Sequence, residues 1–89
     1  MINAVMVTVK IAGASVQYDM ELPADIPIKE LSLKLLMALK NIEMENKLFM
    51  GVESIKIKFD AENRYLYDIE TLASVGVWDG SIITVERVV

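Results

Sequence analysis

The residues of this chain with the clearest capacity for chemistry are two closely spaced carboxylate pairs, Asp60 with Glu62 and Asp68 with Glu70. Paired carboxylates catalyse glycoside hydrolysis when they flank a cleft and one of them has a raised pKa. Both pairs fall on predicted turns, and an 89-residue chain with one layer of sheet leaves little room for a cleft. We therefore interpret them as solvated turn residues.

Other catalytic chemistry is excluded by the residue types that the chain lacks. It contains no cysteine and no histidine, so disulfides, Cys/His zinc sites, Cys or His nucleophiles and a Ser-His-Asp triad are ruled out. A metal site made of carboxylates alone stays open, but no Asp/Glu cluster has a loop-like ligand spacing such as D-x-D-x-D-G. We predict no catalytic, cofactor-binding or metal-binding residue, and therefore a protein that is not an enzyme.

Composition indicates one small globular domain over residues 1–89. The hydrophobic content is 54%, and the length is near the lower limit for a single core. A net charge of −4 argues against nucleic-acid binding, which usually requires a basic stripe. No apolar run approaches the roughly 18 residues of a membrane span, and "MINAVMVTVK" does not resemble a signal peptide. We expect a cytoplasmic protein without direct membrane insertion.

Two alternating segments at the start of the chain predict a hairpin. Residues 4–11, "AVMVTVKI", carry apolar side chains at every odd position, and residues 16–22, "VQYDMEL", carry them at every even position. A period of two is typical of strands with one buried face. The intervening "AGAS" contains Gly13 and predicts the turn.

A helix is predicted over residues 28–42, "IKELSLKLLMALKNI", because the segment is rich in Leu, Lys, Ala and Glu. Pro27 suits its first turn, where a missing N–H is tolerated. At about 100° per residue, one apolar stripe should lie on the sheet. Its members are Ile28, Leu31, Leu35, Ala38, Leu39 and Ile42.

Leu33 and Met37 lie on the opposite side of this helix, with Leu36 beside them. One interpretation is that the loop at 43–53 covers them, or that they are isolated exposed apolar residues, which are common. The other is that this helix back, defined as Leu33, Leu36 and Met37, binds a partner or a second copy of the chain.

The second half of the chain predicts three more strands. Residues 54–59, "SIKIKF", alternate with Ile55, Ile57 and Phe59 inward. A turn at 60–63 and a short edge strand at 64–67 follow. A compact connector should place Leu72 and Val77 in the core, and residues 82–88 form the last strand.

Trp78 precedes that last strand, in a turn that Asp79 and Gly80 complete. A lone Trp in such a position more often plugs the margin of a core, with its N–H on a carbonyl, than stands exposed as a binding hot spot. We therefore expect a buried Trp78.

The predicted order is β-β-α-β-β-β, with a mixed sheet packed on one main helix, which is the α+β class. The first and last strands are the most continuously apolar. Because the longest apolar runs need the most burial, we expect these two strands to pair in parallel at the centre of the sheet.

Three stretches carry a resemblance to a known family: "ELPADIPIKEL", "IKIKFDAENRYLYDIETL" and "VGVWDGSIITVERV". Over nearly the whole chain they resemble the β-grasp of ubiquitin-like proteins. Within that superfamily, "LPADIPIKEL" with "GVWDGSIITV" is most similar to YukD/EsaB-type proteins. The resemblance implies a small accessory component of a bacterial type VII secretion system.

The tail departs from conjugated ubiquitin-like proteins and from the similar sulfur carriers. Those end in a flexible Gly-Gly that threads the tunnel of an activating enzyme, whereas this sequence ends Arg87-Val88-Val89. Two β-branched residues are stiff and bulky. The departure, which YukD/EsaB-type proteins share, implies no conjugation through the C-terminus, unless the chain is a processed or truncated form.

Without a reactive group, function must lie in recognition. The first candidate surface is the solvent face of the predicted sheet, which ubiquitin-like domains generally use, with an apolar centre and a basic rim. We call this the sheet face, and its candidate residues are Met6, Thr8, Lys10, Lys56, Lys58, Ile82 and Thr84, with Glu86 at the rim. An ordinary half-solvated face with scattered apolar residues is the alternative. The helix back is the second candidate surface.

These observations lead to one hypothesis and two alternatives. The hypothesis is a non-enzymatic adaptor of a type VII secretion system, which docks on a membrane or ATPase component without cofactors. The first alternative is a β-grasp regulatory subunit of a multicomponent enzyme such as a diiron monooxygenase. The second is a sulfur or protein-conjugation carrier whose Gly-Gly was lost or lies beyond this sequence.

Overall fold

The computed structural model describes residues 3–88, and Met1, Ile2 and Val89 lie outside the described part. β1 (Ala4–Ile11) and β2 (Gln17–Pro23) form the predicted antiparallel hairpin. Gly13 in its turn has a φ of +79°, a left-handed value that glycine adopts at little cost. The odd-numbered side chains of β1 face the core, as the alternation predicts.

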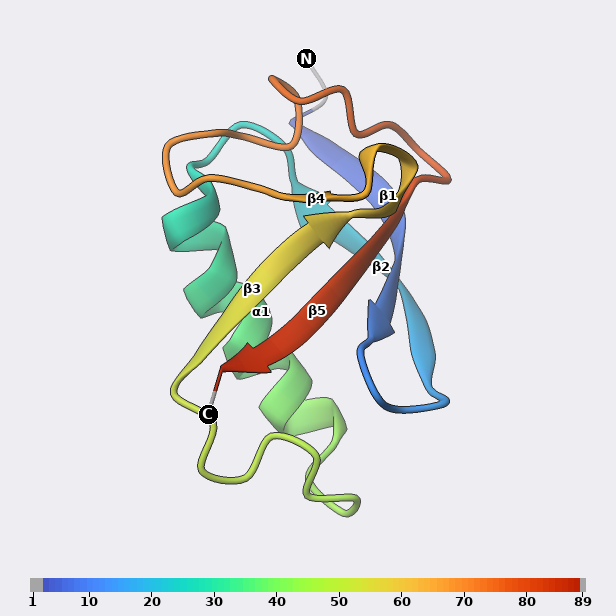
Figure 1. Ribbon diagram of the computed structural model, residues 1–89, viewed down its shortest axis with the longest axis vertical. Helices are drawn as coiled ribbons and strands as arrows, with labels where there is room; N and C mark the ends of the chain where they lie inside the picture. Colours follow the sequence, from blue (N-terminus) through green and yellow to red (C-terminus); the bar gives the residue numbers. More distant parts are fainter. Residues whose placement is uncertain (1–2, 89) are drawn as a thin grey trace.

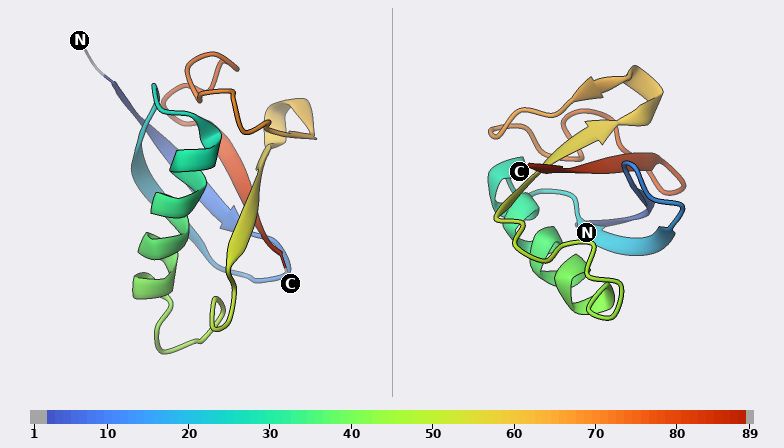
Figure 2. Two further views of the ribbon diagram at one scale, coloured as in Figure 1. Left: turned by 90° about the vertical axis from the view of Figure 1, so that its left-hand side faces the viewer. Right: turned by 60° about the horizontal axis from the view of Figure 1, so that its bottom comes forward.

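α1 (Ile28–Ile42) has the predicted bounds, with Pro27 as its N-cap. The helix lies across one face of the sheet, as Figures 1 and 2 show. Leu35 and Leu39 are buried there as predicted. The prediction for Ile42 is wrong, because this residue is 46% exposed. The helix ends at Ile42, and the next residue, Glu43, occupies the buried position at this end.

β3 (Ser54–Phe59), β4 (Arg64–Tyr65) and β5 (Ile82–Val88) complete a five-stranded sheet of order β2-β1-β5-β3-β4. β1 and β5 pair in parallel at its centre, as predicted, and the other neighbouring strands are antiparallel. A 3-10 helix, η1 (Asp60–Glu62), turns the chain between β3 and β4. One helix on a mixed sheet confirms the predicted α+β class and element order.

The core lies between α1 and the sheet, and two loops close its ends. Leu72 and Val77, in the connector before β5, are buried as predicted. At the other end, Phe49 of the loop after α1 is buried. Arg87 of β5 fastens this loop, because its guanidinium donates to the carbonyl oxygens of Leu48 at 3.0 Å and Ala12 at 3.3 Å. The core that supports the sheet is therefore covered at both ends.

Candidate protein-docking surface

The register of the central strands brings the predicted sheet-face residues together. Thr8 of β1 lies beside Ile82 of β5, and Lys10 lies beside Thr84. On the other side of β5, Lys58 is the partner of Thr84. Paired residues of neighbouring strands project to the same face. The even-numbered residues of β1, β3 and β5 therefore form one surface, on the side of the sheet opposite α1.

The centre of the sheet face is apolar. Met6 and Ile82 are 44% and 41% exposed. Thr8 and Thr84 lie between them and the lysines, and both are half-buried. The Thr8 hydroxyl donates to Asp19 at 2.8 Å, and the Thr84 hydroxyl donates to Asp60 at 2.7 Å. Since these hydroxyl protons are already engaged, the two threonines offer a partner mainly their methyl groups.

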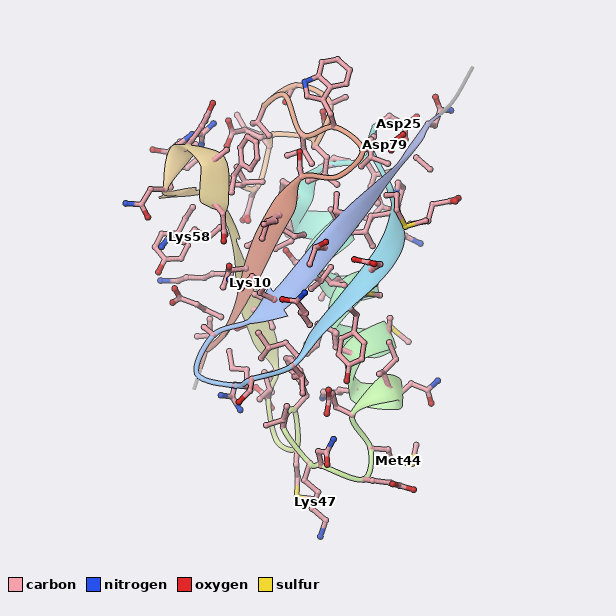
Figure 3. All side chains as sticks on the ribbon, turned by 90° about the vertical axis from the view of Figure 1, so that its right-hand side faces the viewer. Lys10, Asp25, Met44, Lys47, Lys58 and Asp79 are labelled. Carbon is pink, nitrogen blue, oxygen red and sulfur yellow. The ribbon has the colours of Figure 1, made fainter. Side chains whose placement is uncertain are left out.

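A basic side borders this apolar centre. Lys10 and Lys58 flank Thr84, and Figure 3 shows both lysines on the same side of the view. The ammonium of Lys56 lies 5.5 Å from the centre of the Tyr65 ring, a cation–π arrangement. The hydroxyl of Tyr65 donates to Glu86, and this bond raises the pKa of Tyr65. The predicted basic rim is therefore present along β3.

The sequence interpretation missed an acidic side on the same face. The hairpin register places Glu21 beside Met6, Asp19 beside Thr8 and Gln17 beside Lys10. The charge of the sheet face therefore changes from negative at β2, which carries carboxylates, to positive at β3, which carries lysines. The signal was available, because pairing the two alternating segments across the turn at Gly13 places these residues opposite β1.

Trp78 is not a buried plug, and that prediction is wrong. Its side chain is 73% exposed, and the connector holds it by backbone bonds. The Trp78 amide donates to the Ser81 hydroxyl at 2.9 Å, and its carbonyl accepts from the Ser81 amide at 3.0 Å. Asp79, next along, accepts from the Met6 amide at 2.8 Å. These bonds place Trp78 at the end of the sheet where Met6 lies, and its exposure makes it a hot-spot candidate.

Among the paired carboxylates, Asp60, Glu62 and Glu70 accept hydrogen bonds within the fold. Glu70 accepts two bonds from the Arg64 guanidinium, at 3.1 and 2.9 Å, and one from the Tyr67 amide at 2.7 Å. These bonds hold the pKa of Glu70 below its usual value. Glu70 and Asp60 are half-buried, so the solvated-turn interpretation is wrong for both. Within residues 3–88 no group of three acidic residues could hold a metal ion.

The helix back is smaller than predicted. Leu33 and Met37 are 58% and 73% exposed, so the loop at 43–53 does not cover them. Leu36 is only 5% exposed, and its place in this surface is wrong. It lies on the flank of α1 that faces β3, and it lines a hollow together with Ile55.

Among residues 3–88, none of the helices combines the length and the apolar content that a membrane span requires.

Comparison with solved structures establishes the ubiquitin-like fold. A chain of the "MycP5-free ESX-5 inner membrane complex, State II" is similar, with a TM-score of 0.76 and 22% identity. The similarity covers 97% of this protein but only 21% of that larger chain. The ubiquitin-like domain of the Mycobacterium tuberculosis type VII secretion system protein ECCD1 is similar with a TM-score of 0.75 and 19% identity, covering 97% of this chain and 100% of that one. The EccD5 ubiquitin-like domain from Mycobacterium xenopi is similar with a TM-score of 0.73 and 20% identity, covering 96% and 94%.

Sequence comparison identifies the family. No curated protein matches this chain. A family model described as "WXG100 protein secretion system (Wss), protein YukD" matches residues 5–85. This match contains β2, α1, β3 and β4 and most of β1 and β5. The protein therefore belongs to the YukD family of the WXG100 protein secretion system.

Proposed function

We propose that this protein is a non-enzymatic adaptor of the secretion system, which docks through its sheet face on a protein of the inner membrane complex. The observation that carries the proposal is the continuous apolar centre of Met6 and Ile82 on the two central strands, bordered by charges of both signs. Aromatic and apolar residues inside a polar rim are typical of docking surfaces. A similar fold occurs within a larger chain of an inner membrane complex, which supports a partner of this kind.

The charge distribution determines the partner chemistry that we propose. A partner that meets the lysines on β3 should be acidic there, and it should carry an apolar side chain that packs on Met6 and Ile82. The partner is a membrane or ATPase component, and the protein works as a single ubiquitin-like domain on the cytoplasmic side. Binding should weaken as salt rises, because exposed charges are screened within about 10 Å at 0.1 M ionic strength.

The test removes the apolar centre while the fold is kept. Met6→Asp with Ile82→Asp should reduce the affinity for the purified inner membrane complex of the same host by at least about thirtyfold, which corresponds to about 2 kcal/mol. Both side chains are partly exposed, so circular dichroism should remain that of the folded protein. Met37→Glu on the helix back is the matched control, because Met37 is 73% exposed on α1, away from the sheet face. Retained binding by the sheet-face variant would refute the proposal.

A double variant of the helix back, Leu33→Glu with Met37→Glu, tests for a homodimer. If α1 carries a dimer interface at Leu33 and Met37, two glutamates there should reduce the hydrodynamic size. We propose that this surface makes no such interface, and we expect an unchanged elution volume in size-exclusion chromatography. A shift to a smaller species would assign the helix back to a homodimer.

We also propose that the adaptor works without conjugation. Val88 is β-branched and pairs with Ser54 in the sheet, so the backbone at this position is held in β5. Val89 lies outside the described residues. Incubation with ATP and the host's activating enzymes should leave the intact mass unchanged. A thioester, thiocarboxylate or isopeptide adduct would identify a carrier instead.

A further inference from the structure

The outer edge of β3 is covered by another strand only along its second half. β4 pairs with Lys58 and Phe59, and the Leu66 amide adds one bond to the Ile57 carbonyl at 2.9 Å. Figure 1 shows no strand along the first half of β3 on that side, where α1 lies behind the sheet. Within residues 3–88, Ser54–Lys56 therefore present a free strand edge.

The alternation of hydrogen bonds determines which backbone groups this edge offers. The bond from Leu66 shows that Ile57 faces outward. On the far side of β5, the Val85 carbonyl accepts from the Ala12 amide at 2.9 Å, so Val85 does not bond to its register partner Ile57. Backbone groups of an antiparallel strand alternate between sides. The amide and carbonyl of Ile55 therefore also face outward, where no backbone partner among residues 3–88 meets them.

Two hollows flank this edge and form one groove. The hollow of about 210 Å³ lies between β3 and α1, where Leu33 and Leu36 contribute apolar walls. The hollow of about 480 Å³ lies beside Lys56 and Tyr65. Ser32, Ile55 and Asp68 line both hollows, which therefore adjoin at the free edge. The groove ends where the connector crosses to α1, because the Lys29 amide bonds there to the Asp68 carbonyl at 3.1 Å.

We propose that this groove binds a short extended peptide segment of a partner protein, which adds to the outer edge of β3 and pairs with Ile55. Strand addition satisfies the two outward backbone groups, and side-chain pockets on alternate sides provide selectivity. A helical segment has no free backbone groups to offer such an edge. The groove shares Lys56 with the sheet face, but the proposal does not depend on docking through the sheet face.

The groove also predicts the peptide's residue types. A peptide residue opposite Ile55 projects toward α1, onto Leu33 and Leu36, so it should be apolar. Its two neighbours project to the side of Lys56, where a carboxylate forms a favourable cross-strand pair. Lys29 lines the hollow on the α1 side, where its charge offsets that of Asp68. On the other side, Glu86 is the register partner of Lys56 but lies one strand further from the edge, so Lys56 is the charge nearest to the peptide's outward residues. The occupant should therefore alternate apolar and acidic residues.

A pair of defined peptides tests the proposal with the full chain. One is a capped peptide of about six residues that alternates Glu and Val, and its control alternates Lys and Val. In nitrogen-15 correlation spectra, the Glu/Val peptide should shift the amides of Ser54–Ile57 and slow hydrogen exchange of the Ile55 amide. The Lys/Val peptide should bind about fivefold or more weakly, as expected for an opposed charge pair.

Charge reversal supplies the matched variants. Lys56→Glu should reverse the preference between the two peptides, because the groove then presents a carboxylate to their outward side chains. Lys34→Glu introduces the same charge away from the groove, because a rotation of about 100° per residue puts Lys34 on the flank of α1 opposite Leu36. This variant should preserve the preference for the Glu/Val peptide. Peptide shifts centred on Met6 and Ile82, or absent from β3, would overturn the proposal. So would edge amides that shift with protein concentration alone, since a second copy would then occupy the groove.

Discussion

The hydroxyl of Tyr18 in β2 donates a hydrogen bond to the carboxylate of Glu43 at the end of α1. Glu43 is buried, with only 1% of its surface exposed. The Asn46 side-chain amide donates to the other carboxylate oxygen at 2.9 Å. A buried carboxylate is costly unless it is hydrogen-bonded. Here both oxygens are bonded, so Glu43 joins the hairpin to the C-terminal end of the helix.

This contact should make stability depend on pH at both extremes. The bonds from Tyr18 and Asn46 hold the pKa of Glu43 below its usual 4.5, against the opposite effect of burial. That stabilisation is therefore present above pH 4.5 and is lost as the pH falls through the lower folded pKa. The same bond raises the pKa of Tyr18 above 10.0, so its contribution is present below pH 10.0 and is lost as the pH rises through the folded value.

Glu43→Gln should flatten the acid limb of the stability profile. The free energy of unfolding, from urea melts between about pH 3 and 7, should fall less steeply toward acid than in the wild type. Tyr18→Phe should lower stability at neutral pH, because Glu43 loses a donor while it stays buried. Glu70, whose pKa Arg64 also lowers, retains its own acid dependence in both variants. Parallel acid limbs for wild type and Glu43→Gln would contradict the assignment.

Leu33 and Leu36 offer a matched pair of deletions on α1. Leu36 is 5% exposed against β3, so Leu36→Ala should cost about 2–5 kcal/mol of unfolding free energy. Leu33 is 58% exposed, and Leu33→Ala should change stability by less than about 0.5 kcal/mol. Urea denaturation of the two variants measures both values. Equal losses would mean that the helix is rotated relative to the sheet.

The regular elements were predictable because one side of each element is buried. Alternation located β3 and β5 at residues 54–59 and 82–88, and the apolar stripe located α1 at 28–42. Pairing of β1 with β5 followed from their long apolar runs. These features depend on local periodicity, which a single sequence records directly.

The misplaced residues depend on contacts between distant segments. A helical wheel puts Leu36 on a flank, and only the position of β3 decides that this flank is covered. Glu43 is bonded to Tyr18, which lies 25 positions earlier. The free edge of β3 required the short length of β4. No local pattern in the sequence records contacts between segments that are so far apart along the chain.

Trp78 gives a direct spectroscopic test, since it is the only tryptophan of the chain. A side chain that is 73% exposed should show the emission of a water-exposed indole and strong quenching by acrylamide. Trp78→Ala should change the free energy of unfolding by less than about 0.5 kcal/mol. A blue-shifted emission that acrylamide scarcely quenches would restore the buried plug. Reduced quenching on addition of the inner membrane complex would place Trp78 in the docked surface.

Asp79 fastens the connector to β1, and this bond can be tested with two closely matched variants. Its carboxylate accepts from the Met6 amide at 2.8 Å, and the next residue, Gly80, donates its amide to the Met6 carbonyl at 2.8 Å. Asp79→Ala removes the acceptor at an exposed site where water can replace it, so we expect a loss of about 1 kcal/mol. Asp79→Asn keeps an acceptor oxygen and should lose less than half of that. Hydrogen exchange of the Met6 amide should accelerate in Asp79→Ala and change little in Asp79→Asn. If the two variants are equally unstable, the charge of Asp79 and not its hydrogen bond to Met6 stabilises this end of the sheet face.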